Sequence, residues 1–242
     1  MKILITNDDG IRGEGLAVLA SALQKKGHEL IIVAPKENNS AVSHKITMRV
    51  PFTLEKLTEN SYAVGGTPAD CVLVALCYLK IKPDLIISGI NTGVNMGSDV
   101  LYSGTVAGAL EGAQNGLPSI ALSQYLKRSF TDEEISIALN RAASIAAEKL
   151  PEWFELAKTT GAVNINFPPF EPLGTRVCKQ AHTHYNTSYA LREDGQLQMQ
   201  FNPPEPAGDG DIPLIKAGYI TLTPLEVDLT DYAALTKWEK AE

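Results

Sequence analysis

Hydrophobic residues in the first 150 positions follow two alternating patterns. Short, nearly continuous apolar runs occupy residues 2–6, 29–33, 84–88 and 119–123, as expected for strands buried on both faces of a parallel sheet. Between these runs, apolar residues recur every three or four positions, as on one face of an amphipathic helix, and residues 16–23 are the first example. Alternating strands and helices predict an α/β fold with a mainly parallel sheet flanked by helices.

Local start and turn signals support this prediction. The segment 67–70, Thr-Pro-Ala-Asp, combines a capping residue, a proline in the first turn and an acid three residues after the cap. Residues 131–134 form a similar capping box before a long amphipathic helix, and residues 105–115 predict a further helix that is closed by a glycine. Residues 45–57 and 61–64 alternate in character and predict a hairpin.

The pattern changes after Lys149, where most of the prolines lie and helical periodicity becomes scarce. We therefore predict a single domain in which residues 1–150 form the main sheet and its helices. Residues 151–242 would then be a β-rich remainder that partly rejoins the sheet and partly extends outward as an arm. This remainder is expected to end in a helix over residues 232–240.

The charge balance restricts the partners. The chain has 242 residues and a formal net charge of −7 at pH 7. A negative field repels nucleic-acid backbones and anionic membranes, so neither duplex nucleic acid nor a membrane is an expected partner. An anionic substrate would need a local positive element, which a bound cation or a helix N-terminus can supply.

Targeting and cysteine usage indicate a cytoplasmic protein. The first strand begins at Lys2 and leaves no room for a signal peptide, and no apolar run approaches the ~20 residues of a membrane span. The three cysteines, Cys71, Cys77 and Cys178, lack paired spacing, so we expect reduced thiols. Cys71 and Cys77 lie six residues apart on a predicted buried helix and are expected in the core.

Polar loops follow three of the predicted strands. Residues 7–10 read Asn-Asp-Asp-Gly, residues 35–40 read Pro-Lys-Glu-Asn-Asn-Ser, and residues 89–95 read Gly-Ile-Asn-Thr-Gly-Val-Asn. Because ligands bind beyond the carboxyl ends of parallel strands, we expect these loops to meet at one edge of the sheet. Their carboxylate, hydroxyl and amide oxygens suit hard cations such as magnesium, manganese or calcium rather than zinc.

The adjacent acids Asp8 and Asp9 are the strongest metal candidates. Without a cation, two neighbouring carboxylates repel each other, and the pKa of one of them rises. The alternative is an ordinary β-turn, because Asn, Asp and Gly all favour turns. The position directly after the first strand, beside two other polar loops, favours the metal site.

A phosphate-binding element is predicted at residues 103–105. Ser103, Gly104 and Thr105 precede a helix, where backbone N–H groups and the helix dipole favour an anion. The alternative is ordinary helix capping by Thr105. The segment lies 12 residues after Asn91 and is expected on the same edge as the acids, which favours a phosphate cradle.

Other candidate features carry less weight. His44 lies near the second polar loop and can contact a base or protonate a leaving group, but a lone loop histidine is usually just solvated. His182 and His184 would share one face of a strand, but two histidines are too few for a zinc site, so we interpret them as structural. The segment 10–15 is glycine-rich without matching the dinucleotide fingerprint, and the chain contains no P-loop.

Five stretches of the chain resemble the SurE family, whose members are known as 5'/3'-nucleotidases or survival proteins. In order, they are ILITNDDGIRGEGL, VAPKENNSAVSHKIT, GGTPADCV, DLIISGINTGVNMGSDVLYSGTVAGALEG and GYITLTPL. They span nearly the whole chain. The resemblance implies a Rossmann-like sheet with a β-hairpin extension, a divalent metal ion, nucleoside monophosphates as substrates, and dimers or tetramers.

The resemblance also assigns residues. It implies that Asp8, Asp9, Ser40 and Asn91 are the metal ligands. Many relatives have arginines in the stretch before the serine, but this chain reads Lys-Glu-Asn-Asn there, so substrate contacts made by those arginines are not expected. Asn95 and the Ser103–Thr105 cradle also match the family pattern and are expected to bind the substrate phosphate.

These observations predict a phosphomonoesterase that uses Mg²⁺ or Mn²⁺ and acts on nucleoside 5'- and 3'-monophosphates, with short polyphosphate as a further candidate. Asp8 and Asp9 would hold the ion, and one of them would accept a proton from the attacking water. Attack by an aspartate ranks lower, because a metal-bound carboxylate is a weakened nucleophile. The alternatives are a metal-dependent deacetylase, which needs histidines near the acids, and a nucleotide-binding regulator without catalysis.

Overall fold

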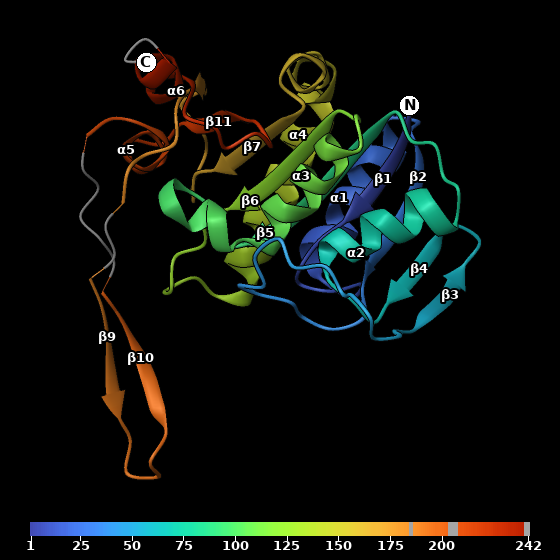
Figure 1. Ribbon diagram of the computed structural model, residues 1–242. Helices are drawn as coiled ribbons and strands as arrows, with labels where there is room; N and C mark the ends of the chain where they lie inside the picture. The colour runs from blue at the N-terminus through green and yellow to red at the C-terminus, as the bar shows by residue number, and fades with distance from the viewer. Residues whose placement is uncertain (184–185, 203–207, 240–242) are drawn as a thin grey trace.

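The computed structural model describes residues 1–183, 186–202 and 208–239, and within these residues nine strands form one sheet (Figure 1). In spatial order the strands are β3 (Leu54–Thr58), β4 (Ser61–Val64), β2 (Glu29–Pro35), β1 (Lys2–Thr6), β5 (Leu85–Thr92), β6 (Ser119–Gln124), β7 (Ala162–Phe167), β11 (Ile220–Leu225) and β8 (Thr175–Val177). Strands β4, β2, β1, β5, β6 and β7 run parallel, whereas β3 and β11 are antiparallel to their neighbours β4 and β7. The predicted mainly parallel α/β fold is confirmed.

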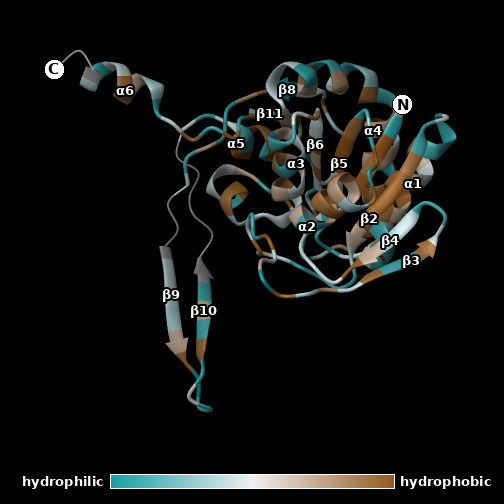
Figure 2. Ribbon diagram, turned by 45° about the vertical axis from the view of Figure 1, so that its right-hand side comes forward, coloured by the Kyte–Doolittle hydropathy of each residue, from teal (hydrophilic) through white to brown (hydrophobic). Residues whose placement is uncertain are grey.

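Helices cover both faces of the sheet. Helices α1 (Glu14–Lys25) and α4 (Asp132–Thr160) cover one face, and α2 (Pro68–Leu73) and α3 (Gly104–Gln114) cover the other. The short helix α5 (Asp211–Lys216) precedes β11, and α6 (Tyr232–Glu239) lies away from the sheet (Figure 2). Because side chains alternate along a strand, Ile3 and Ile5 of β1 pack with α1 and α4, whereas Leu4 packs on the other face with α2. Figure 2 shows the hydrophobic residues concentrated in the central strands and in the helices that cover them.

Helix α4 is longer than predicted. It continues through Pro151 to Thr160, although proline usually ends or kinks a helix. Trp153 and Ala157, which follow the proline, are almost fully buried against the sheet. Packing of this last part of the helix therefore outweighs the missing backbone hydrogen bond. The short helix α5 was also not predicted.

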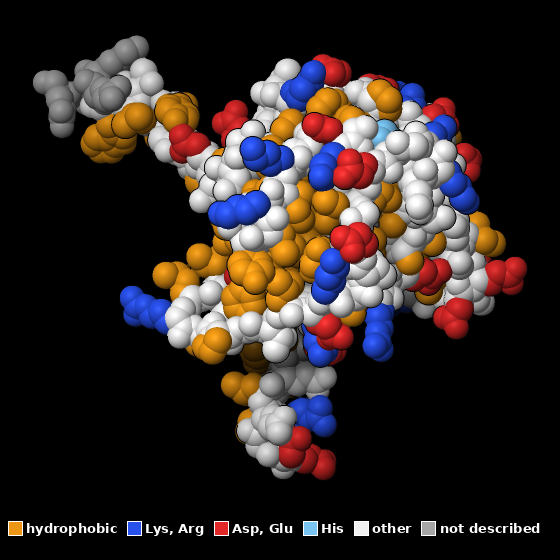
Figure 3. Space-filling model, turned by 90° about the vertical axis from the view of Figure 1, so that its right-hand side faces the viewer, with side chains coloured by type: hydrophobic (Ala, Val, Ile, Leu, Met, Phe, Trp, Pro, Cys, Tyr) orange, Lys and Arg blue, Asp and Glu red, His pale blue; other side chains and the backbone are white. Residues whose placement is uncertain are grey.

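The hairpin predicted from residues 45–57 and 61–64 forms only in part: residues 45–53 contain no strand, and β3 and β4 lie at the edge of the main sheet. Strand β3 pairs with β4, and β4 pairs in parallel with β2. Figure 3 views the molecule from this side, where hydrophobic side chains gather on the surface. The exposed hydrophobic residues of β3 and the segment before it are Ile46, Met48, Val50, Phe52, Leu54 and Leu57.

A second pair of strands leaves the body of the molecule. Strands β9 (Asn186–Leu191) and β10 (Leu197–Asn202) pair antiparallel and project away from the main sheet (Figure 1). Three further strands that follow residue 150, β7, β8 and β11, lie in the main sheet. None of the described helices is both long and apolar enough to cross a membrane.

The two cysteines that were expected in the core differ in their exposure to solvent. Cys71 is fully buried in α2, and burial raises the pKa of its thiol. Cys77 is exposed, so its predicted burial was wrong. It lies in a π-helical turn, Val74–Tyr78, that follows α2, and this wider turn changes which side chains face the sheet.

Candidate active site

The carboxyl ends of β1, β2 and β5 meet at one edge of the sheet and surround an open cavity of about 390 Å³. Its lining includes the four predicted metal ligands and two of the predicted phosphate-binding residues: Asp8, Asp9, Ser40, Asn91, Asn95 and Ser103. The loops after three strands therefore place these six side chains around one space. It is also lined by residues that were not predicted as site residues: Asn38, Thr92, Asp99 and Tyr102.

Asp8 is the buried acid of the pair. Its side chain is only 5% exposed, and Oδ1 accepts a hydrogen bond of 2.5 Å from the hydroxyl of Thr105. Burial and, to a smaller extent, the charge of Asp9 raise the pKa of Asp8 from 3.8 to about 6, although the hydrogen bond from Thr105 lowers it. A cation between the two acids would favour the ionised form of both.

Asp9 is less buried and is oriented by β5. Its Oδ2 accepts hydrogen bonds of 3.2 Å from both the backbone N–H and the hydroxyl of Thr92. Asp9 lines the cavity, and no hydrogen bond to its Oδ1 is found among the described residues. The neighbouring Asn91 donates from Nδ2 to the carbonyl of Gly93 over 2.9 Å, which leaves its Oδ1 as an acceptor.

Ser40 lies on the long loop after β2, which crosses the edge of the sheet. The N–H of Asn39 donates to the carbonyl of Asp8 over 2.7 Å and fixes this loop beside the acids. Both the N–H and the hydroxyl of Ser40 donate to Oδ1 of Asn38, over 2.9 and 2.7 Å. The oxygen lone pairs of Ser40 therefore stay available for a cation.

Asn95 is held by polar side chains at the ends of β6 and β7. Its N–H donates to Oδ1 of Asn166, and its carbonyl accepts from Nδ2 of both Asn164 and Asn166. Its own Nδ2 donates to the hydroxyl of Ser123 over 2.8 Å. The polar residues of β7, Asn-Ile-Asn, were a signal for this support, because buried strands seldom carry two asparagines without a purpose.

Helix α3 is capped at its N-terminus, but not by Thr105, the residue that the alternative interpretation named. Ser103, not Thr105, is the N-cap: its hydroxyl accepts a hydrogen bond of 3.0 Å from the N–H of Val106. Thr105 instead bonds to Asp8 through its hydroxyl, and its backbone N–H also contacts that carboxylate. Gly104 packs so tightly on Asp8 that an added Cβ would lie 2.9 Å from the Cβ of Asp8. The N-terminus of α3 is therefore directed at Asp8.

The described histidines lie outside this cavity. The interpretation of His44 as a solvated loop residue was wrong: its Nε2 lies 2.9 Å from Oε2 of Glu111 on α3. His182 is exposed, and His184 lies outside the described residues. Among the residues that the structure describes, no three His, Cys, Asp or Glu side chains gather as a metal site. The donors at the cavity are two carboxylates, a hydroxyl and amide oxygens.

Residues 3–187 match the family model described as survival protein SurE. The chain belongs to the SurE family. It is 40% identical over 249 residues to the protein of Clostridium beijerinckii named 5'-nucleotidase SurE, covering 98% of this chain and 97% of that one. A protein of the same name from Nitratidesulfovibrio vulgaris is 41% identical over the whole of both chains. The crystal structure of the SurE protein from Aquifex aeolicus covers 100% of this chain and 99% of its own, with 32% identity and a TM-score of 0.83.

The family predicted from the sequence motifs is thus confirmed. The agreement with the Aquifex aeolicus SurE structure over the full chain extends to the Rossmann-like sheet.

Proposed function

We propose that this SurE-family chain is a phosphomonoesterase that depends on a divalent cation and hydrolyses nucleoside 5'- and 3'-monophosphates to nucleoside and phosphate. Relatives at about 40% identity over nearly the full length are named 5'-nucleotidase SurE, which supports a hydrolase of the nucleotidase type. The observation that carries the proposal is the Asp8–Asp9 pair, which lines an open polar cavity beside the N-terminus of α3.

The donors at this cavity fit a hard cation. Asp8, Asp9, Ser40 and Asn91 would hold it, because all four offer oxygen atoms, as Mg²⁺ and Mn²⁺ prefer. Asp8 is buried next to Asp9, so a bound cation would offset the repulsion between the two carboxylates. When bound, the cation would supply Lewis-acid chemistry by offsetting the charge of the phosphate and favouring ionisation of water.

The side chains have separate roles in the proposed reaction. Asp8 is fixed by Thr105 and is largely sealed from solvent, so it serves to bind. Asp9 is held through one oxygen by Thr92, and its other oxygen can accept the proton of the attacking water. As water attacks phosphorus, the bond from phosphorus to the nucleoside oxygen breaks, and that oxygen takes up the proton that Asp9 received from the water. The positive end of the α3 dipole and Asn95 favour the phosphate in this cavity.

The proposal also covers the assembly and the location of the protein. We expect a homodimer or homotetramer that works in the cytoplasm on small nucleotides. Short polyphosphate is a further candidate substrate, because its terminal group presents the same oxygens to the cavity.

The test is the release of inorganic phosphate from a panel of 5'- and 3'-nucleoside monophosphates and short polyphosphate, with and without a chelator. We expect chelator-sensitive release from the nucleotides. Binding of nucleotides without release would favour the non-catalytic regulator. Release of acetate from N-acetylated sugars with zinc, and no phosphate release, would favour the deacetylase. The structure gives this alternative little support, because His44 is bonded to Glu111 and not to Asp8 or Asp9.

A further inference from the structure

A second cavity, of about 340 Å³, lies along α3 next to the catalytic one. The two cavities share Ser103, and the same two segments contribute to both. The loop after β2 lines the first cavity with Ser40 and the second with His44. Because Ser43 is hydrogen-bonded to Leu101 and Tyr102 between the two cavities, a ligand with its phosphate at the acids would reach the second cavity over the outside of this contact. The volume of the second cavity lies in the range of small-molecule sites.

The second cavity has a lining that suits a flat, partly apolar ring. Its apolar lining comes from Val100, Ala107 and Leu110 and from Leu225 at the end of β11. Polar side chains also line it, among them His44, Gln114 and Gln180. Apolar walls with a few placed polar groups are the usual composition of a site for an aromatic heterocycle.

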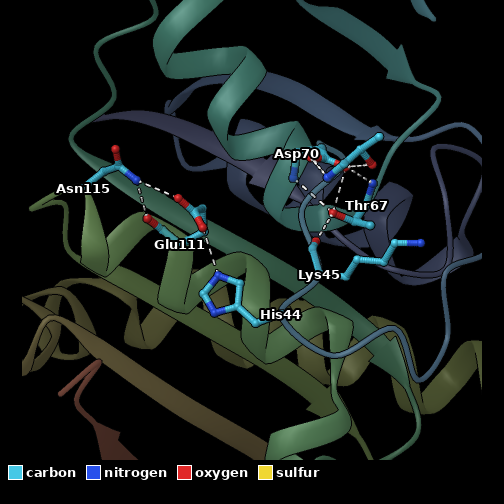
Figure 4. Close-up of polar contacts among 7 residues, drawn as sticks. His44, Lys45, Thr67, Asp70, Glu111 and Asn115 are labelled. Atoms are coloured by element: carbon cyan, nitrogen blue, oxygen red, sulfur yellow. Dashed lines mark hydrogen bonds and ion pairs between the residues drawn. The ribbon is translucent and has the colours of Figure 1, made fainter. Parts of the chain in front are cut away.

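His44 is the best-placed polar group of this cavity (Figure 4). Its Nε2 lies 2.9 Å from Oε2 of Glu111, which is only 5% exposed, and Oε1 of Glu111 accepts from Nδ2 of Asn115 over 3.0 Å. Since a carboxylate only accepts hydrogen bonds, Nε2 carries the hydrogen, and Nδ1 of the neutral ring is an acceptor. No hydrogen bond to Nδ1 is found among the residues that the structure describes. The ring is thus fixed in position, and Nδ1 remains available to accept a hydrogen bond from a ligand.

The loop that carries His44 is itself anchored. The hydroxyl of Ser43 donates to the carbonyl of Leu101 over 2.6 Å, and the hydroxyl of Thr67 donates to the carbonyl of Lys45 over 2.6 Å. Figure 4 shows the contacts of Lys45 and His44 on either side of one turn of this loop. These bonds place His44 between α2 and α3 independently of any ligand, as a preformed recognition site requires.

We propose that the second cavity binds the nucleobase of the substrate, and that Nδ1 of His44 accepts a hydrogen bond from an exocyclic amino group of that base. The inference rests on the proposed nucleotidase function. It concerns the nucleoside half of the substrate, which contacts to the phosphate do not define. It assigns base recognition to His44, which is oriented by Glu111.

Adenosine and inosine monophosphates form the matched pair for this test, because hypoxanthine has a carbonyl where adenine has the amino group. A neutral hydrogen bond changes a ratio of kcat/KM by about three- to tenfold, so we expect the adenine nucleotide to be preferred by this factor. His44→Gln places its Nε2 near the position of the histidine Nε2, keeps a donor for Glu111 and removes Nδ1. The preference should fall to near unity in this variant.

Two comparisons make the result specific. His28→Asn changes a histidine at the amino end of β2, remote from both cavities, and should keep the wild-type preference. Gln114→Trp fills the mouth of the second cavity from an exposed position of α3, so it should lower kcat/KM for adenosine monophosphate more than for ribose 5-phosphate. Equal kcat/KM for the two nucleotides in the wild type, or an unchanged preference in His44→Gln with no effect of Gln114→Trp, would overturn the proposal.

Binding of adenosine, measured by saturation-transfer NMR, separates this inference from the nucleotidase proposal. If no phosphoester is hydrolysed but adenosine binds the wild type and not His44→Gln, the function fails and the base site stands. If nucleotides are hydrolysed but adenosine binds the wild type and His44→Gln alike, the base site is wrong and the function stands.

Discussion

The hydroxyl of Thr105, at the start of α3, donates a hydrogen bond of 2.5 Å to Oδ1 of Asp8, at the end of β1. This bond joins residues 97 positions apart in the chain. It stabilises the ionised form of a carboxylate that burial pushes towards the neutral form. Thr105 therefore tunes the acid on which the proposed metal site depends.

Replacing Thr105 with Val should raise the pKa of Asp8 further, because a bond that favours the ionised form is lost while the shape is kept. The acidic limb of the pH profile of kcat/KM should move to higher pH. Thr105→Ser retains the hydroxyl and should keep the wild-type profile. Coincident profiles for Val and Ser would show that the hydroxyl does not act on Asp8.

Replacing Asp8 with Asn should stabilise the metal-free protein above pH 6. The folded-state pKa of about 6 lies above the ordinary value of 3.8, so the folded state binds this proton more tightly than the unfolded state does. The free energy of unfolding of the wild type should thus fall as the pH rises from 3.8 to 6, by up to about 3 kcal/mol. Asp8→Asn should lack this fall. Denaturant titrations at pH 4 and pH 7 test it, and equal pH dependence in both proteins would refute it.

Ser103→Ala and Gly104→Val should damage different properties. Ser103→Ala removes the N-cap of α3 and should lower the free energy of unfolding by about 0.5–2 kcal/mol. Gly104→Val adds a Cβ that would lie 2.9 Å from the Cβ of Asp8, so the acid must move. In the valine variant, kcat/KM and the inhibition by phosphate or vanadate should fall by more than the change in melting temperature would explain. Unchanged values for Gly104→Val would remove this segment from the site.

Self-association is expected from α6. In Figure 3 the C-terminal segment projects from the body, and Tyr232, Leu235 and Trp238 of α6 are 58%, 44% and 74% exposed. Exposed apolar residues on a projecting helix are typical of interfaces. Light scattering at micromolar concentration should give the mass of a dimer or tetramer, and Trp238→Glu should lower it. A monomeric wild type would contradict the expectation.

The fold was predictable because local patterns and tertiary packing agree over most of the chain. Apolar runs marked β1, β2, β5 and β6, and the capping boxes of Thr67 and Thr131 form as predicted. The sequence failed where packing overrules a local rule. The pattern was expected to change after Lys149, but α4 continues through Pro151 to Thr160 and buries Trp153.

Residues of the candidate site could be predicted from the sequence, but the hydrogen bonds that join them to distant segments could not. Asp8 and Asp9 stood out because they directly follow a buried strand, and such positions converge at one edge of a parallel sheet. Ser40 and Asn91 were separated from their neighbours only by resemblance to the SurE family. The bonds of Thr105 to Asp8 and of His44 to Glu111 join distant segments. No local spacing encodes such contacts.

The most direct test of the central claim is the rate of phosphate release from adenosine monophosphate by enzyme freed of metal with a chelator and then titrated with Mg²⁺ or Mn²⁺. Asp9→Asn is the test variant and His28→Asn the matched control. We expect no release before metal is added, saturable recovery in the wild type and in His28→Asn, and rates lower by orders of magnitude in Asp9→Asn at every metal concentration. Full activity of the metal-free enzyme, wild-type rates in Asp9→Asn, or recovery with zinc alone would contradict it.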